Sequence, residues 1–315
     1  MSLLDLPILA IFGPTASGKS AVAVELAKEL NGEIISCDSM QIYKEMNIGT
    51  AKITTEECQG IPHHLIDFLH ISERFDASLF IKATEKLIQE ISDRGKLPII
   101  AGGSGMYARL LLYGGDMLPS DKAIAKNIRQ QYEESGLEPL VEELKVIDPI
   151  SAEKHIQTPR RIFRALEVVR LTGQALPGKV SWHDETRFRN VHQYILIGEP
   201  DEARTLIRKR TRTMLEQGWI EEVRDLVEQG LLDSPTAFQS LGYREIHQFL
   251  NGGFENDIEQ LYEKLVTQTC RYAKKQRTWF RNQHHGATII PRKATDKLSD
   301  LTQIILNDWL KKQTI

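Results

Sequence analysis

Short apolar runs alternate with segments of helical periodicity in the first third of the chain. The runs at 8–12, 33–38 and 97–101 are rich in strand-forming side chains. Between them, apolar residues recur at helical spacing in 20–30 and 75–94. This β-α-β-α-β order predicts an α/β fold in which helices cover a parallel sheet.

The pattern changes after Gly114-Gly115. Residues 119–172 carry only helical periodicity, and no strand-like run returns until 194–197. A helical stretch between two strands of one sheet predicts an all-helical insertion at 117–193, within a core formed by 1–116 and 194–315. The remaining expected elements are strands at 63–67 and 288–290 and helices at 202–217, 220–228, 258–282 and 298–311.

The clearest motif follows the first predicted strand. Residues 13–20 match the phosphate-loop pattern G-x-x-x-x-G-K-[ST], which is typical of nucleotide-binding and ATP-binding proteins. Backbone N–H groups and the dipole of the next helix favour an anion at such a loop. Lys19 adds a full charge, and the Ser20 hydroxyl can hold Mg²⁺. The candidate diphosphate-binding residues are Gly13, Pro14, Thr15, Ala16, Ser17, Gly18, Lys19 and Ser20.

A carboxylate ends the second predicted strand. Asp38 should lie beside the phosphate loop, because ligands in open α/β sheets bind at the carboxyl ends of strands. It can act as a base or hold magnesium through water. The third strand ends in the glycine-rich stretch 102–105, so the acidic residue of an ordinary ATPase is absent there. This favours a small-substrate transferase. The stretch 102–105 is either a plain turn or a close backbone approach to a substrate.

Three basic clusters stand out against a net charge of −3. Each cluster alone is compatible with a solvated helix face. The last one also contains aromatic residues, and cations together with stacking aromatics are what a nucleic-acid binder needs. The clusters are Arg160, Arg161, Arg164 and Arg170; Arg204, Arg208, Lys209, Arg210 and Arg212; and Arg271, Lys274, Lys275, Arg277 and Arg281 with Tyr272, Trp279 and Phe280.

The amino-acid composition indicates the cellular compartment and bears on whether a membrane segment or a zinc site is expected. No apolar run is long enough for a transmembrane helix, and the first strand begins too early to leave room for a signal peptide. Cys37, Cys58 and Cys270 are widely spaced, which suits a reducing compartment and argues against a zinc module. The pairs at 63–64 and 284–285 are histidines without further ligands at suitable spacing. We therefore expect a cytoplasmic protein without a membrane segment and without zinc.

The order of several motifs resembles one family. GPTASGKS at 13–20, DSMQIY at 38–43, GGSGMY at 102–107, RRIFRALEV at 160–168, SLGYRE at 240–245 and TCRYAKKQRTWFR at 269–281 follow one another along the chain. Together they resemble the tRNA dimethylallyltransferases, also called tRNA isopentenyltransferases, over nearly the whole chain. The phosphate loop alone is generic, whereas the last two motifs together are specific. Because the late part of the chain lacks the zinc finger of eukaryotic members, the chain is similar to the short bacterial type.

The resemblance implies a P-loop NTPase-like core and an insertion that grips the tRNA anticodon stem-loop. The phosphate loop would hold the pyrophosphate of dimethylallyl diphosphate, with Mg²⁺ as cofactor and Ser20 as its ligand. The acceptor would be the exocyclic amine of the adenosine 3′-adjacent to the anticodon, flipped out of the loop. Asp38 would accept the proton, while Thr15, Lys19 and Arg210 would meet the pyrophosphate.

Residue roles follow from the same resemblance. The implied catalytic residues are Asp38, Thr15 and Arg210. The implied tRNA-binding residues are Asp38, Ser39, Met40, Gln41, Ser104, Arg160, Arg161, Ile162, Phe163, Arg164, Ser240, Leu241, Gly242, Tyr243, Arg244 and Glu245. The expected partners are tRNA and dimethylallyl diphosphate, and we expect a monomer.

Other functions remain open at this point. An adenylate (free-nucleotide) isopentenyltransferase would share the phosphate loop and Asp38, but it would not need three basic clusters. A P-loop small-molecule kinase would share the loop and would consume ATP. A non-enzymatic RNA-binding module would leave Lys19, Ser20 and Asp38 unexplained.

Overall fold

A computed structural model describes residues 2–115, 118–177, 183–234 and 236–313. The chain forms two compact units: a core, Met1–Tyr113 with Asp184–Ile315, and an insert, Gly114–His183. The expected boundary at 116/117 lies outside the described residues. At the far end, 184–193 belongs with the core, not with the insert: Arg187 pairs with Glu85 at 2.8 Å, and Phe188 is fully buried in the core.

The core is built on one parallel sheet of six strands in the order β3-β2-β4-β1-β5-β6. The central strand β1 pairs with β4 on one side and with β5 on the other. All five of its residues are buried, as expected for a strand covered on both faces. The strands are β1 (Ile8–Phe12), β2 (Gly32–Cys37), β3 (His63–His64), β4 (Leu97–Gly102), β5 (Val191–Gly198) and β6 (Thr288–Arg292).

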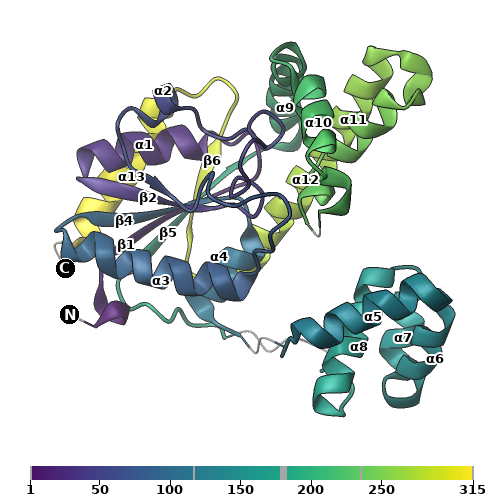
Figure 1. Ribbon diagram of the computed structural model, residues 1–315. Coiled ribbons are helices and arrows are strands. Elements are labelled where there is room, and N and C mark those ends of the chain that lie inside the picture. Colours follow the sequence, from purple (N-terminus) through teal and green to yellow (C-terminus); the bar gives the residue numbers. More distant parts are fainter. Residues whose placement is uncertain (1, 116–117, 178–182, 235, 314–315) are drawn as a thin grey trace. The chain divides into compact units, whose positions relative to one another are not determined.

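Helices cover both faces of this sheet (Figure 1). On one face, α1 (Lys19–Glu29) and α13 (Leu298–Gln313) pack on Leu9 and Ile11 of β1. On the other, α3 (Ala77–Asp93) and α4 (Gly105–Tyr113) pack on the alternate residues of β1. The predicted fold class, a P-loop NTPase-like α/β core, is thereby confirmed, although α4 was not predicted as a helix.

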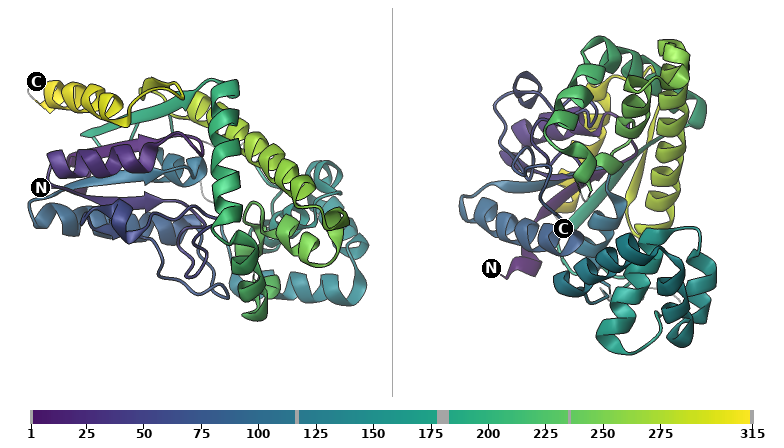
Figure 2. Two further views of the ribbon diagram at one scale, coloured as in Figure 1. Left: turned by 90° about the horizontal axis from the view of Figure 1, so that it is seen from above. Right: turned by 45° about the vertical axis from the view of Figure 1, so that its right-hand side comes forward.

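A helical layer lies at the carboxyl ends of the strands. There α9 (Pro200–Glu216) crosses α12 (Ile258–Gln283), as the left view of Figure 2 shows. Arg208 pairs with Glu263 and Arg212 with Glu259, so two cations of the second basic cluster join these helices. The layer is completed by α10 (Trp219–Glu228) and by α11 (Tyr243–Leu250), which was not predicted. The short elements of the core are α2 (Thr55–Cys58), η1 (Leu3–Asp5), η2 (Leu231–Asp233), η3 (Ala237–Gln239) and η4 (Gly253–Asn256).

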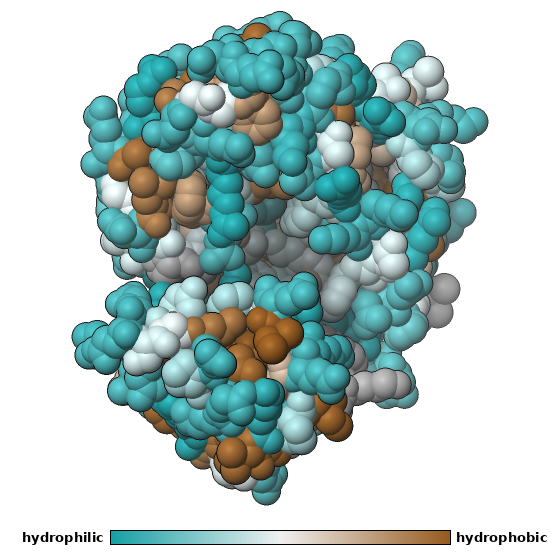
Figure 3. All heavy atoms as spheres, turned by 90° about the vertical axis from the view of Figure 1, so that its right-hand side faces the viewer, coloured by the Kyte–Doolittle hydropathy of each residue, from teal (hydrophilic) through white to brown (hydrophobic). Residues whose placement is uncertain are grey.

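The insert is a four-helix unit with its own apolar core. Its helices are α5 (Lys122–Ser135), α6 (Glu138–Ile147), α7 (Pro149–His155) and α8 (Pro159–Thr172). Buried Ile128, Leu144 and Leu166 meet at its centre. Other apolar side chains of this unit, such as Val146 and Ile150, are exposed. Apolar surface on one face of the molecule is drawn in brown in Figure 3.

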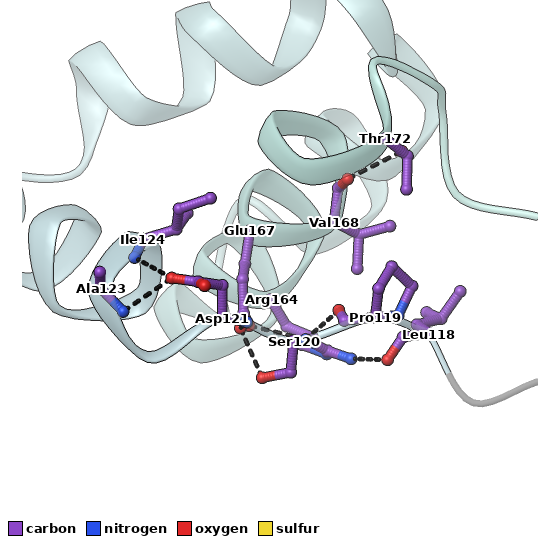
Figure 4. A network of polar contacts seen from close by, with 10 residues as sticks. All are labelled: Leu118, Pro119, Ser120, Asp121, Ala123, Ile124, Arg164, Glu167, Val168 and Thr172. Atoms are coloured by element: carbon purple, nitrogen blue, oxygen red, sulfur yellow. Dashed lines mark hydrogen bonds and ion pairs between the residues drawn. The ribbon is translucent and has the colours of Figure 1, made fainter.

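A polar network fastens the first residues of the insert to α8 (Figure 4). The Arg164 guanidinium donates to the carbonyl oxygens of Leu118 and Pro119 at 2.6 and 3.0 Å and pairs with Glu167 at 2.7 Å. Glu167 is buried and also accepts hydrogen bonds from the Ser120 hydroxyl and the Asp121 N–H. These bonds and Arg164 hold the pKa of its carboxyl below its usual range despite burial. This part of the first basic cluster is therefore structural.

Across the described ranges, no helix has the length and apolar character needed to cross a membrane.

Candidate active site

The phosphate loop connects β1 to α1 at the carboxyl edge of the sheet. Gly18 has φ of +82°, a left-handed conformation that glycine adopts at little cost, and it places the first turn of α1 directly after the loop. The N–H groups of this first turn have no helical partner, and the helix dipole adds positive potential. The backbone thus forms the anion site that the sequence predicts.

Two cations converge on this loop. Lys19 donates from Nζ to the carbonyl oxygen of Pro14 at 3.3 Å, and Arg210 donates from Nη1 to Thr15 Oγ1 at 3.1 Å. Burial lowers the pKa of Lys19 from 10.5 to about 8; the Asp38 carboxylate opposes this fall and the Arg210 charge adds to it. Burial also lowers the pKa of Arg210. Two desolvated cations side by side are unfavourable alone, so they favour binding of a polyanion between them.

Asp38 follows β2 directly and lies close enough to both cations to affect their pKa values. Its Oδ1 accepts hydrogen bonds from the backbone N–H groups of Met40 at 2.9 Å and Gln41 at 3.3 Å. No hydrogen bond from another described residue engages Oδ2, so this oxygen is left for a substrate. The neighbouring Cys37 thiol is buried, which raises its pKa and removes it as a competing base.

A small pocket of about 260 Å³ is lined by Ser39, the residue that follows Asp38. Ser39 and Ser104 line it, and the Ser39 N–H donates to Ser104 Oγ at 3.0 Å. Its other wall carries Tyr272 and Trp279 of α12. Gln41 stands nearby and donates to the carbonyl oxygens of Thr50 and Ala51, both at 3.1 Å, which closes the loop that follows Asp38. A pocket with serine hydroxyls on one side and aromatic rings on the other suits a flat heteroaromatic base.

The outer face of α12 carries the third basic cluster. It lines an open groove of about 730 Å³, whose walls include Arg271, Lys274 and Lys275. These side chains are exposed, and none of them pairs with a carboxylate of the described residues. Arg208 and Arg212, by contrast, are neutralised by glutamates of α12. Unpaired cations beside aromatic rings are the arrangement that binds a nucleic-acid backbone.

The SLGYRE motif at 240–245 is mostly structural. Tyr243 is fully buried and donates from its hydroxyl to Glu222 at 2.7 Å; Ser240 and Gly242 are buried as well. Glu222 in turn accepts hydrogen bonds from three consecutive backbone N–H groups, at positions 47–49. The side chains of Ser240 and Tyr243 are therefore buried, and the tRNA-binding role expected for them stays a prediction. Leu241 lines the α12 groove, Arg244 is exposed, and Glu245 is half-buried.

Some of the expected tRNA-binding residues of the insert are exposed, and others are buried or engaged in structural contacts. Arg160 and Arg161 are exposed at the start of α8. Ile162 is completely buried in the insert core, so its side chain cannot contact RNA as expected. Phe163 is half-buried against the ring of Tyr132. Arg164 is held in the network described above.

The donor set fits magnesium better than a caged metal. The Ser20 hydroxyl is exposed in the first turn of α1, and the Asp38 carboxylate is half-buried nearby. No group of three His, Cys, Asp or Glu side chains that could hold a metal occurs among the residues that the structure describes. Magnesium usually binds through one or two protein oxygens together with water and substrate phosphates. These residues can therefore hold an ion that arrives with a diphosphate.

One residue at this site was not predicted. Gln276 of α12 accepts a hydrogen bond from the Thr15 N–H at 2.9 Å. It lies within the motif at 269–281. A neutral side chain gives no charge or stacking signal in the sequence, unlike its cationic and aromatic neighbours.

Comparison with known proteins agrees with this geometry. The family profile described as IPP transferase matches residues 41–283. The tRNA dimethylallyltransferase of Anoxybacillus flavithermus is 43% identical over 280 residues, 88% of each chain, and that of Limosilactobacillus reuteri is 39% identical over 314 residues, 97% of this chain and 99% of the relative.

Solved structures give the same result. The tRNA isopentenylpyrophosphate transferase of Bacillus halodurans superposes with a TM-score of 0.70 at 35% identity, over 98% of both chains. A eukaryotic dimethylallyltransferase acting on tRNA superposes with a TM-score of 0.76 at 26% identity, over 98% of this chain and 80% of that one. The chain belongs to the tRNA dimethylallyltransferase family of enzymes.

Proposed function

We propose that this protein transfers the dimethylallyl group of dimethylallyl diphosphate to the exocyclic amine of the adenosine 3′-adjacent to the anticodon of a tRNA, and releases diphosphate. The observation that carries the proposal is the meeting of Lys19, Arg210 and Asp38 at one loop. Lys19 and Arg210 would stabilise the departing diphosphate, and Asp38 would act as the base for the amine that is alkylated.

The donor half of the reaction uses the phosphate loop. The bond between the allylic carbon and the diphosphate oxygen breaks, and the electron pair leaves with the diphosphate. Lys19, Arg210 and the Thr15 hydroxyl neutralise the charge that builds on this oxygen in the transition state. Mg²⁺, which Ser20 would hold, supplies further positive charge to the leaving group.

The acceptor half uses Asp38. The adenine amine forms a bond to the allylic carbon and loses one proton, which Asp38 Oδ2 accepts. The hydrogen bonds from Met40 and Gln41 to Oδ1 hold the carboxylate and direct the other oxygen at the amine. Ser39 and Ser104 line the adjoining pocket and can hydrogen-bond the base edge, while Tyr272 offers a ring for stacking.

The unpaired cations of α12 favour a tRNA over a free nucleotide as acceptor. Arg271, Lys274 and Lys275 form an exposed cationic surface that a polyanionic tRNA backbone would use and a free nucleotide would not need. Exposed Arg160 and Arg161 give the insert a second cationic surface for the anticodon stem-loop. An enzyme that acts on tRNA works where tRNA is found, which favours the cytoplasm. We expect the monomer to be the active form.

A direct test combines the protein, Mg²⁺, dimethylallyl diphosphate and unmodified tRNA, followed by mass spectrometry of the digested nucleosides. A dimethylallyl-sized gain on one adenosine, absent with Asp38→Ala, is expected. A gain on free AMP but not on tRNA would favour the adenylate isopentenyltransferase instead. ATP consumption without any prenyl transfer would favour the kinase.

A further inference from the structure

A buried glutamine joins the phosphate loop to the loop after β4. Gln276 of α12 is 8% exposed. Its Oε1 accepts from the Thr15 N–H, and its Nε2 donates to the carbonyl oxygen of Gly103, each at 2.9 Å. Because one end of a carboxamide only accepts and the other only donates, these two partners fix the amide in one orientation. Both ends of the side chain are therefore used.

The two loops meet Gln276 closely. A Cβ atom at Gly103 would lie 2.7 Å from Gln276 Nε2, so a larger residue there would displace the amide from its present position. The glycine stretch 102–105 thus makes a close approach to the protein's own glutamine and not only a turn. On the other side, Gln276 holds the main chain of Thr15 while Arg210 holds its hydroxyl. The position of Thr15 is fixed from two helices.

The helix that carries Gln276 is itself anchored beside the loop. One turn further on, Phe280 stacks on Phe12, the last residue of β1, with ring centroids 5.7 Å apart. Lys274 and Lys275, directly before Gln276, face the open groove. The same two turns of α12 therefore carry the cationic surface outside and the contact with the phosphate loop inside.

We propose that Gln276 is a positioning residue that holds the phosphate loop in its diphosphate-binding conformation. It acts through its hydrogen bonds to Thr15 and Gly103, and its side chain also lines the small pocket beside Ser39. The role of the held loop in catalysis rests on the proposed function, whereas its effect on diphosphate binding does not.

Inorganic diphosphate and the full-length chain provide the first readout. Gln276→Leu keeps the apolar bulk but leaves the Thr15 N–H and the Gly103 carbonyl unpaired. The Kd for diphosphate, measured by calorimetry, and the KM for dimethylallyl diphosphate should both rise about tenfold or more. The Kd for tRNA should change less than about twofold. Lys275→Gln should raise the Kd for tRNA and leave the Kd for diphosphate unchanged. Gln89→Leu, the same substitution on α3, should change neither of these two dissociation constants.

A second variant separates positioning from packing. In Gln276→Glu, a protonated carboxyl can still accept from Thr15 and donate to Gly103, whereas the ionised form cannot donate. Burial should raise the pKa of this new carboxyl, while the Lys19 and Arg210 charges near Gly103 and Thr15 oppose that rise. Diphosphate affinity relative to the wild type at the same pH should therefore be near normal at low pH and fall as the pH rises through that pKa. Gln276→Leu should stay weak at every pH.

Three results would overturn the proposal. Gln276→Leu could bind diphosphate as tightly as the wild type. Diphosphate and tRNA affinities could fall together with the melting temperature, as for a residue that only fills space. The diphosphate affinity of Gln276→Glu, relative to the wild type, could be independent of pH. If Gln276→Leu does not fold, the glutamate variant alone tests the proposal. If the wild type transferred no dimethylallyl group, the proposed function would fail, while diphosphate binding would still judge Gln276.

Discussion

Raising the pH from about 7 to about 9.5 should weaken the binding of dimethylallyl diphosphate, because Lys19 loses its proton in this range. Burial lowers the pKa of Lys19 from 10.5 to about 8. This shift corresponds to about 3 kcal/mol against the ammonium form. Since the diphosphate binds that form, its Kd should be lowest near pH 7 and rise about tenfold per pH unit well above 8.

The same shift affects the unliganded fold in the opposite direction. The unfolded chain binds more protons at Lys19 than the folded chain does between about pH 8 and 10.5, so the contribution of Lys19 to stability rises with pH there. Weaker binding at high pH would therefore not reflect a less stable fold.

Calorimetry in buffers of different ionisation enthalpy gives both the Kd and the protons taken up on binding. Near pH 8, where Lys19 is about half protonated, we expect an uptake of about half a proton per site. Lys19→Arg should abolish this uptake, because a guanidinium stays charged throughout the range. A flat Kd for the wild type between pH 7 and 9.5, or the same slope in the arginine variant, would refute the reasoning.

Three further substitutions test separate parts of the structure. Asp38→Asn keeps an oxygen acceptor but no base, so single-turnover transfer should slow about 100-fold or more with tRNA affinity little changed; an unchanged rate would exclude Asp38 as the base. Arg164→Ala should lower the melting temperature, whereas Arg161→Ala should leave it unchanged and reduce the salt slope of tRNA binding by about one; the reverse pattern would mean that Arg164 contacts RNA. Tyr243→Phe should lower the free energy of unfolding in urea by about 1 kcal/mol through the lost bond to Glu222, and a selective loss of tRNA binding would contradict its structural role.

Periodicity alone located the core elements closely. The strand expected at 8–12 is β1 itself, and the helix expected at 258–282 is α12 with one residue more. Apolar runs between helices leave few arrangements other than a covered parallel sheet, which also placed Asp38 at the right edge. The helices α4 and α11 were missed because α4 begins in the glycine-rich stretch 102–105 and α11 begins directly after Gly242, where the local signal indicates a turn.

The roles of the arginines could not be separated from the sequence. Arg208 and Arg212 are one turn apart and share a face of α9, whereas Arg210 lies on the opposite face. Glu263 and Glu259, which are also one turn apart, pair with Arg208 and Arg212 and turn that face of α9 toward α12. The opposite face, with Arg210, then meets the phosphate loop. Such partners lie about fifty residues away and are brought together only by the tertiary fold. Gln276 was missed for a similar reason, because a neutral side chain shows its role only through its contacts.

The contact between Thr15 and Gln276 spans 261 positions of the chain. During synthesis the ribosome adds the phosphate loop among the first residues and Gln276 among the last. The strand β5, which flanks β1, also follows the whole insert. Domains generally fold as units during translation, so the insert can fold while the core still lacks two of its six strands. A nascent or truncated chain that ends before α12 would therefore present an unfinished loop, and substrate binding should begin only when translation is nearly complete.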